Sequence, residues 1–191
     1  MLENIIPSKT RRKILELFFQ NPNDNFYLRR IVRELNEEVN AVKRELDILT
    51  NEKLLLKEKR LNKIFYNLNK NYIFYDEFLR IFTKNGPILQ MIYKNLPRLG
   101  KIKYIAFSSR FAKKMPIKDE DIYFLYVGII ILKDLEILMK KAEEIFKAPI
   151  NYTVMTEEEF VFRKKNNDPF IWRFLRQPKI MLIGDEESLM R

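Results

Sequence analysis

Apolar residues recur every three or four positions in three consecutive segments between residues 8 and 51. This spacing gathers them on one face of a helix, so each segment is predicted to be a short α-helix. The sequence NPND at Asn21–Asp24 ends the first helix, because proline and asparagine favour turns, and a short extended NFYL precedes the second. The apolar positions are Ile14, Leu17 and Phe18, then Leu28, Ile31, Val32 and Leu35, then Val39, Val42, Leu46 and Leu49.

Two strand-like runs follow the three helices. They are Leu54–Glu58 and Ile64–Leu68, and the second is rich in aromatic and β-branched residues, which favour strands. The polar and basic sequence KRLNK joins them. Two strands with so short a connection predict a β-hairpin.

This order of elements resembles the winged helix-turn-helix domain of small bacterial and archaeal transcriptional regulators. The resemblance covers about Ile6–Asn71 and is carried by FYLRRIVRELNEEVNAVKRELDILTNEKLLLKEKRLNKIFYNLNKN. In that family the third helix lies in the major groove and the wing runs along the backbone or the minor groove. The resemblance implies that Glu38–Asn51 is the recognition helix. Its apolar residues, Val39 included, would then face the core.

Several polar residues are left on the outer surface of this predicted domain. On the recognition helix, Lys43 and Arg44 suit guanine edges or phosphates, and Asn40 suits adenine. The basic hairpin suits contact with phosphates. A solvated helix face without a ligand is the alternative for the helix residues. The candidate DNA-binding residues are Asn40, Lys43, Arg44, Lys57, Lys59, Arg60, Asn62 and Lys63.

Residues 72–99 contain two further apolar-striped segments. Tyr72–Lys84 and Ile88–Leu99 are separated by NGP, a turn sequence. One interpretation is a pair of helices that link and cover the two domains. The other is a dimerisation element, because a small DNA-reading domain needs a second copy to bind two half-sites. We therefore expect a helical linker at 72–99 and a homodimer formed through it.

Strands and helices alternate after Gly100, which predicts a small α/β domain at residues 100–185. IKYIAF, INYTVM and KIMLIG are strand-like, and Ile122–Gly128 has the continuous apolar character of a buried central strand. Apolar residues between Leu135 and Phe146 recur at helical spacing. Thr156 forms a capping box with the glutamate three residues later, and the Asp-Pro pair at 168–169 opens another helix.

The order strand, loop, acid-initiated strand, helix, strand resembles the minimal nucleotidyltransferase domain, whose fold is shared with DNA polymerase β. The resemblance covers about Leu99–Asp185 and implies Gly-Ser on the loop and Asp-hydrophobic-Asp on the next strand. In that family the glycine lets the backbone approach a triphosphate, and the two acids hold metal ions. Here Ser109-Arg110 takes the Gly-Ser position, Asp121 takes the first acid position and Tyr123 the second. The later strand, INYTVM, has no acid to match the family's third carboxylate.

These departures predict a catalytically degenerate domain that needs no cofactor. One carboxylate beside a tyrosine cannot present two metal ions, and Arg110 is a bulky cation where the loop must approach phosphate. The acids at 119 and 120 leave an active transferase open as an alternative. The basic run Lys101–Lys118 is either a cationic loop that holds a nucleotide or DNA phosphate without turnover, or a solvated surface. The residues of this vestigial nucleotide site are Ser109, Arg110, Lys113, Lys114, Asp121 and Tyr123.

The charge of the chain favours a polyanionic partner. The 191 residues carry a formal net charge of +10. Binding to nucleic acid with release of counterions is a common use of such an excess. Residues 1–84 hold 17 basic and 12 acidic residues, and residues 85–191 hold 19 and 14, so each half has the same excess of five. Charge alone therefore assigns an anion-binding role to neither half.

Composition also excludes several classes of site. The chain has no cysteine and no histidine, which rules out disulfides, zinc fingers, a thiol nucleophile and an imidazole base. The longest apolar run, Ile122–Leu132, is shorter than the roughly 20 residues of a membrane span. The N-terminus lacks the apolar core of a signal peptide. We expect a cytoplasmic protein without a membrane partner.

Together these observations predict an α+β chain: an N-terminal winged helix-turn-helix, a helical linker and a C-terminal nucleotidyltransferase-like domain. The expected function is that of a prokaryotic DNA-binding transcriptional regulator, with the second domain as scaffold or sensor and double-stranded DNA as partner. Two alternatives come from other classes. One is an active minimal nucleotidyltransferase, such as one half of a toxin–antitoxin pair, and the other is a protein-interaction module.

Overall fold

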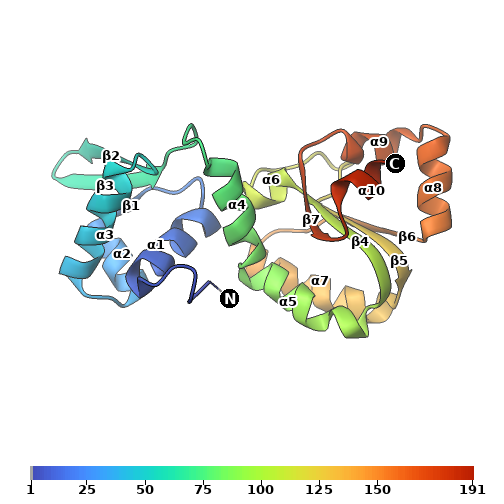
Figure 1. Ribbon diagram of the computed structural model, residues 1–191, viewed down its shortest axis with the longest axis horizontal. Helices are drawn as coiled ribbons and strands as arrows, with labels where there is room; N and C mark the ends of the chain where they lie inside the picture. Colours follow the sequence, from blue (N-terminus) through green and yellow to red (C-terminus); the bar gives the residue numbers. More distant parts are fainter. Residues whose placement is uncertain (1) are drawn as a thin grey trace. The chain divides into compact units, whose positions relative to one another are not determined.

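A computed structural model describes residues 2–191 (Figure 1). The chain divides into two compact units, residues 1–86 and residues 87–191. Each unit combines helices with one small sheet, so the predicted α+β class is confirmed. None of the helices within residues 2–191 combines the length and the apolar composition that a bilayer crossing requires.

The first unit contains the predicted succession of three helices and a hairpin. Ser8 caps α1 by accepting a hydrogen bond from the Arg11 amide, and the asparagine–proline turn ends the helix as predicted. The three strands form an antiparallel sheet in the order β1-β3-β2, with β3 central. The elements are α1 (Lys9–Gln20), β1 (Phe26–Tyr27), α2 (Leu28–Leu35), α3 (Val39–Asn51), β2 (Leu55–Arg60), β3 (Lys63–Leu68) and α4 (Tyr75–Lys84).

Helix α3 contacts the core of this unit through three of its four predicted positions. Val42, Leu46 and Leu49 are buried, whereas Val39 is 48% exposed. The prediction that Val39 faces the core is therefore wrong. It is the first residue of the helix, and contact with the core begins one turn later. Glu45, which the apolar pattern did not select, is buried instead.

The second unit is a four-stranded mixed sheet covered by helices on both faces. Its strand order is β6-β5-β4-β7; β5 and β6 are parallel, and the other pairs are antiparallel. The short α6 and the last helix, α10, are additions to the predicted pattern. The elements are α5 (Pro87–Asn95), the 3-10 helix η1 (Leu96–Arg98), β4 (Gly100–Ser108), α6 (Ser109–Ala112), β5 (Phe124–Ile130), α7 (Leu132–Phe146), β6 (Tyr152–Met155), α8 (Glu157–Lys165), α9 (Pro169–Leu175), β7 (Lys179–Ile183) and α10 (Glu186–Met190).

The alternation of side chains along β4 and β5 divides the core of this unit between the two faces of the sheet. Leu125 and Val127 share a cluster with Phe160 of α8 and Phe174 of α9. On the other face, the Tyr126 hydroxyl donates to the Met139 sulfur of α7 at 3.4 Å. Figure 1 shows α5 and α7 along one side of the sheet and α8, α9 and α10 along the other.

A bulge in β4 requires glycine on the neighbouring strand. The register between β4 and β5 shifts between Ile102 and Tyr104, opposite Gly128. Gly128 has φ +144°, and a Cβ at this position would lie 2.3 Å from the Lys101 carbonyl oxygen. Only glycine allows two strands to approach so closely in this backbone conformation.

Residues 72–99, predicted to form a linker of their own, divide between the two units. In the first unit, Phe82 of α4 stacks on Phe19 of α1 with ring centroids 5.2 Å apart. In the second unit, α5 packs against α7. The two helices therefore belong to separate cores, and the boundary lies in the turn at Gly86 and Pro87.

Candidate nucleic-acid interface

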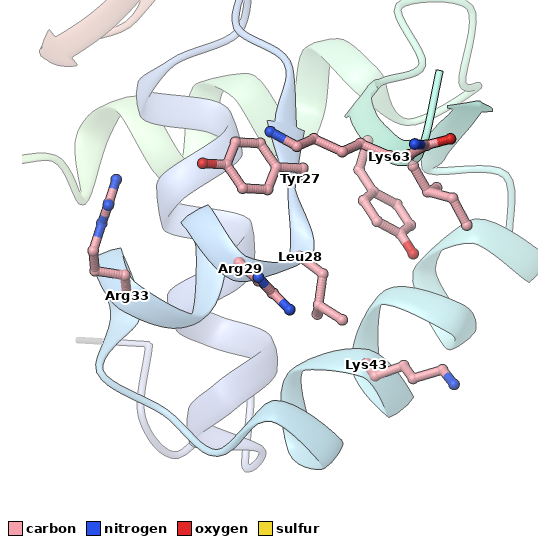
Figure 2. A pocket seen from close by; sticks show the side chains of 9 residues that line it. Tyr27, Leu28, Arg29, Arg33, Lys43 and Lys63 are labelled. Carbon is pink, nitrogen blue, oxygen red and sulfur yellow. The ribbon is translucent and has the colours of Figure 1, made fainter. Parts of the chain in front are cut away.

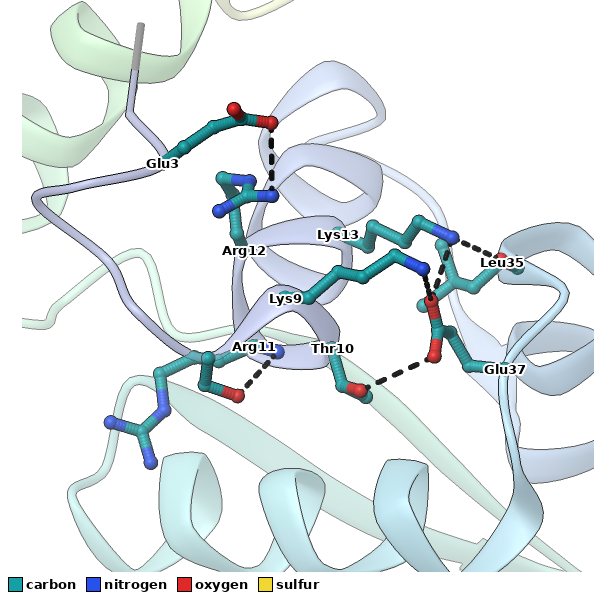
Figure 3. A network of polar contacts seen from close by, with 9 residues as sticks. Glu3, Lys9, Thr10, Arg11, Arg12, Lys13, Leu35 and Glu37 are labelled. Carbon is teal, nitrogen blue, oxygen red and sulfur yellow. Dashed lines mark hydrogen bonds and ion pairs between the residues drawn. The ribbon is translucent and has the colours of Figure 1, made fainter.

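A carboxylate at the start of α3 ties the turn between α2 and α3 to α1. Glu37 accepts hydrogen bonds from Lys13 Nζ at 2.7 Å and from Thr10 Oγ1 at 3.5 Å, and lies 3.4 Å from Lys9 Nζ (Figure 3). Lys13 also donates to the Leu35 carbonyl at 2.8 Å. The hydrogen bond from Lys13 lowers the pKa of Glu37. These contacts hold the end of α2 and the entry to α3 against one helix.

A second carboxylate, Glu45, fixes the middle of α3 to the start of α1. Its Oε1 accepts from the Ser8 hydroxyl and its Oε2 from Arg11 Nε, both at 2.7 Å. The side chain is 4% exposed. Burial alone would raise the pKa of Glu45, but the hydrogen bonds from Ser8 and Arg11 outweigh it, and the pKa is lowered. Because Ser8 also caps α1, one residue pair sets both the start of α1 and the position of α3.

A groove of about 740 Å³ lies between α2, α3 and the β2–β3 hairpin (Figure 2). Its side chains include four cations, Arg29, Arg33, Lys43 and Lys63, and no Asp or Glu of the described chain lines it. The complete lining is Tyr27, Leu28, Arg29, Arg33, Lys43, Asn62, Lys63, Ile64 and Tyr66. A concave surface with cations and no anions attracts polyanions, because concave walls focus the electrostatic field.

Aromatic side chains hold the hairpin cation in place. Lys63 Nζ lies 4.7 Å from the centroid of the Tyr27 ring, a cation–π contact between β3 and β1 that Figure 2 shows. Tyr27 in turn meets Phe65 edge to face at 5.8 Å. The ammonium group of Lys63 is exposed and lies beside a ring that also lines the groove.

The groove contains three of the eight predicted DNA-binding residues, Lys43, Asn62 and Lys63. Lys57 and Lys59 of β2 stand opposite Tyr66 and Ile64 of β3, so their side chains share the sheet face of these two groove residues. Lys57 and Lys59 are nevertheless outside the lining itself, as are the remaining three predicted residues. Asn40 and Arg44 are exposed on α3, and Arg60 is exposed on the hairpin in an ion pair with Glu58 at 2.7 Å.

Helix α2 also contributes to this surface, although none of its residues was predicted to bind DNA. Arg29 and Arg33 are four residues apart and exposed, so they lie on one helix face beside the groove. The same apolar periodicity that predicted α2 leaves these two positions facing outward, and could have identified them. The neighbouring Arg30 differs, because it lies 4.4 Å from the centroid of Phe26 and pairs with Glu34 at 2.6 Å.

The predicted vestigial nucleotide site has a different local structure from the expected loop. Ser109 and Arg110 lie in α6, which Ser108 caps by accepting a hydrogen bond from the Arg110 amide at 3.2 Å. Lys113 ends this helix, and Lys114 follows with φ +48°. The expectation of a loop at Ser109-Arg110 is therefore wrong, because a serine cap starts a helical turn there.

The two positions matched to the family's acid pair have other partners. The Tyr123 hydroxyl donates to the Met115 carbonyl at 2.8 Å, and burial raises its pKa. Asp121 Oδ1 lies 3.7 Å from Arg173 Nη1, and the same nitrogen contacts Glu120 at 2.7 Å. The acids at the start of β5 thus face an arginine of α9. Within residues 2–191, no group of three or more Asp and Glu side chains is placed to hold a metal ion.

Comparisons with known proteins assign no family. No family model and no curated protein matches the chain. One solved structure is that of Bordetella bronchiseptica BpsR, from work on the regulation of its DNA binding by 6-hydroxynicotinic acid. Its sequence is 16% identical to this chain. The matched region covers 51% of this chain and 79% of the BpsR chain, with a TM-score of 0.34. Another solved structure is the ferric uptake regulator from Francisella tularensis with iron, which is 13% identical to this chain. The matched region covers 78% of this chain and 87% of the regulator, with a TM-score of 0.32.

Replacing Glu45 by Gln should loosen α1 and α3. We expect the free energy of opening of these helices to fall by about 1–3 kcal/mol at neutral pH, the range for a buried hydrogen bond to a charged group. Folding lowers the pKa of Glu45 below its ordinary value of 4.5. Ionised Glu45 therefore stabilises the folded state fully at pH values above 4.5, and this stabilisation is lost as the pH falls through the lowered pKa of the folded state. The difference from the unsubstituted protein should therefore shrink in acid. Hydrogen exchange of the α1 and α3 amides measures it.

The matched control is Glu38→Gln, an exposed glutamate at the start of the same helix. It should leave the exchange of both helices nearly unchanged. An effect of Glu45→Gln that is equal at neutral and acid pH would show that shape, rather than charge, is what Glu45 supplies.

Proposed function

We propose that this chain is a DNA-binding transcriptional regulator that contacts duplex DNA through α3, the adjoining groove and the β2–β3 hairpin. The observation that carries the proposal is the concentration of Arg29, Arg33, Lys43 and Lys63 around one groove without a lining carboxylate. Phosphate neutralisation by such cations supplies much of the affinity of proteins for DNA. The resemblance of residues 6–71 to a winged helix-turn-helix gives each element a role.

The proposed roles follow from position. Asn40, Lys43 and Arg44 lie within the first two turns of α3, the part of a recognition helix that contacts base edges. Lys57, Lys59 and Lys63 on the hairpin, with Arg29 and Arg33 on α2, would contact phosphates on either side. The side chain of Arg60 is exposed although it pairs with Glu58, and exposed ion pairs of this kind contribute little to stability. It therefore remains a candidate phosphate contact.

The second unit is proposed to be a scaffold or sensor without transferase activity. The succession β4, β5, α7, β6 agrees with the element order on which the nucleotidyltransferase resemblance rests, with the short α6 at the position of the expected loop. The contacts of Asp121 with Arg173 and of Tyr123 with Met115 favour a degenerate site. The alternatives remain an active transferase, which would incorporate nucleotide, and a protein-interaction module, which would not bind DNA. A prokaryotic regulator of this kind would act in the cytoplasm.

Removing two groove cations should weaken DNA binding and reduce its salt dependence. We expect Arg33→Ala with Lys63→Ala to lower the slope of log affinity against log salt concentration by about 2, one counterion for each lost phosphate contact. Fluorescence anisotropy with a labelled random duplex at several salt concentrations measures this slope. Lys70→Ala with Arg80→Ala, an equal loss of charge at exposed positions outside the groove, is the control. If both double variants lose the same amount of DNA affinity and of salt dependence, the groove is not part of the interface.

A homodimer formed through residues 72–99 is the second part of the proposal. Phe74 and Ile81 are seven residues apart at α4, and are 52% and 45% exposed, so they form an apolar strip on one helix face. We expect Ile81→Glu to convert a dimer to a monomer in light scattering, whereas Arg80→Glu should not. A monomeric unsubstituted protein, with and without DNA, would end this part of the proposal.

The chain should transfer no nucleotide from any nucleoside triphosphate in the presence of Mg²⁺ or Mn²⁺. Paired carboxylates are what hold the metal ions of phosphoryl transfer, and here Asp121 is next to Arg173 instead. Incubation with labelled triphosphates, with the chain itself, RNA and mixed proteins as acceptors, measures incorporation. Label that appears with the unsubstituted chain and disappears with Asp121→Ala would establish the active transferase instead.

A further inference from the structure

A second groove with cations lies on α9 in the unit 87–191. It has a volume of about 550 Å³ and is lined by Asn167, Pro169, Trp172, Arg173, Arg176 and Gln177. Two of these side chains are arginines, and none of the described residues that line it is an acid. Its size falls in the range of small-molecule sites. None of the residues matched to the nucleotidyltransferase motif is in its lining.

Trp172, the only tryptophan in the chain, forms an ordered aromatic wall in this groove. Its indole Nε1–H donates to the Lys164 carbonyl at 3.0 Å, and part of the ring packs against the core cluster of α8, α9 and the sheet. The polar edge of the indole is thus satisfied within the protein. The Arg176 guanidinium lies 5.6 Å from the ring centroid. A fixed indole beside a guanidinium group can stack an aromatic ring and bind an anion at the same time.

The acids around the groove leave its cations accessible. The Asp168 carboxylate accepts from the Phe170 amide at 2.8 Å and lies 2.9 Å from Arg163. Burial alone would raise its pKa, but these partners outweigh burial, and the pKa of Asp168 is lowered. The side chain of Glu120, which pairs with Arg173, is 76% exposed. An exposed pair is weak, so an incoming phosphate can replace Glu120 at Arg173. Asp121, whose side chain is 12% exposed, would remain 3.7 Å from the same arginine nitrogen.

We propose that this groove binds a nucleoside phosphate. The base stacks on Trp172, the phosphate binds Arg173 and Arg176, and the amides of Asn167 and Gln177 lie within the same groove to contact the edge of the base. Non-specific binding of a nucleic-acid strand uses successive aromatic platforms along an extended channel. Here one indole lies in a groove of small-molecule size, which favours a single nucleotide. The proposal does not depend on DNA binding by the first unit.

The single tryptophan provides a direct measurement. Titration of the full chain with AMP and with ATP, without metal ions, should quench Trp172 fluorescence in a saturable way when excitation is at the red edge of its absorption. Inorganic phosphate should quench little, because it cannot stack. Arg176→Ala should weaken nucleotide binding about tenfold, the usual loss for one charge-assisted hydrogen bond. Lys140→Ala, an exposed cation on α7, is the control and should bind like the unsubstituted protein.

Three results would overturn the proposal. The first is a fluorescence that does not saturate with either nucleotide at millimolar concentration. The second is equal affinity in Arg176→Ala and the unsubstituted chain, provided both show the same thermal unfolding. The third is quenching by a single-stranded oligonucleotide at far lower concentration than by AMP, which would identify the groove as a contact for a nucleic-acid strand.

The variant Trp172→Phe retains an aromatic ring on which the base can stack. In calorimetry, its titration with AMP should show a reduced but measurable heat of binding.

Discussion

The first unit depends on one buried carboxylate. A carboxylate removed from water is costly unless hydrogen bonds and an opposite charge replace its hydration. Glu45 obtains both from Ser8 and Arg11, and these contacts are made only when α3 lies against the beginning of α1. The contacts of Glu37 with Lys9 and Lys13 add a second attachment, in the turn just before α3 begins at Val39. The direction of α3, and with it the direction of Lys43, follows from these attachments.

The availability of cations, rather than their number, distinguishes the two grooves from the rest of the surface. Both halves of the sequence have the same excess of positive charge, yet many arginines are paired within their own helix or turn. Arg30 pairs with Glu34, and Arg163 pairs with Glu159 and Asp168. In each groove an aromatic ring lies beside one cation that has no such ion pair within residues 2–191: Tyr27 beside Lys63 and Trp172 beside Arg176. Arg173 of the α9 groove differs, because it pairs with the exposed Glu120. A ring holds a cation in place without neutralising it, which leaves the charge for an anionic ligand.

Arg173 connects the two functional interpretations of the second unit. It lies in the α9 groove and also faces Glu120 and Asp121 at the start of β5. The charge that would oppose metal binding at Asp121 is therefore the same charge that the proposed ligand would contact. The proposed ligand site therefore lies at α9 rather than at α6, where Arg110 donates to the Pro116 carbonyl and Ser108 caps the helix.

The sequence by itself determined the order of the longer helices and of the strands, because apolar periodicity and capping residues are local signals; the short α6 and α10 were not predicted. Thr156 and Asp168 cap the helices that their positions predicted. The tertiary structure alone decided which residues meet. The contacts of Glu45 with Ser8 and Arg11 and the contact of Arg173 with Asp121 join residues 34 to 52 positions apart, and no local pattern encodes such pairings. The division of residues 72–99 had the same cause, since amphipathic helices reveal an apolar face but not the core that covers it.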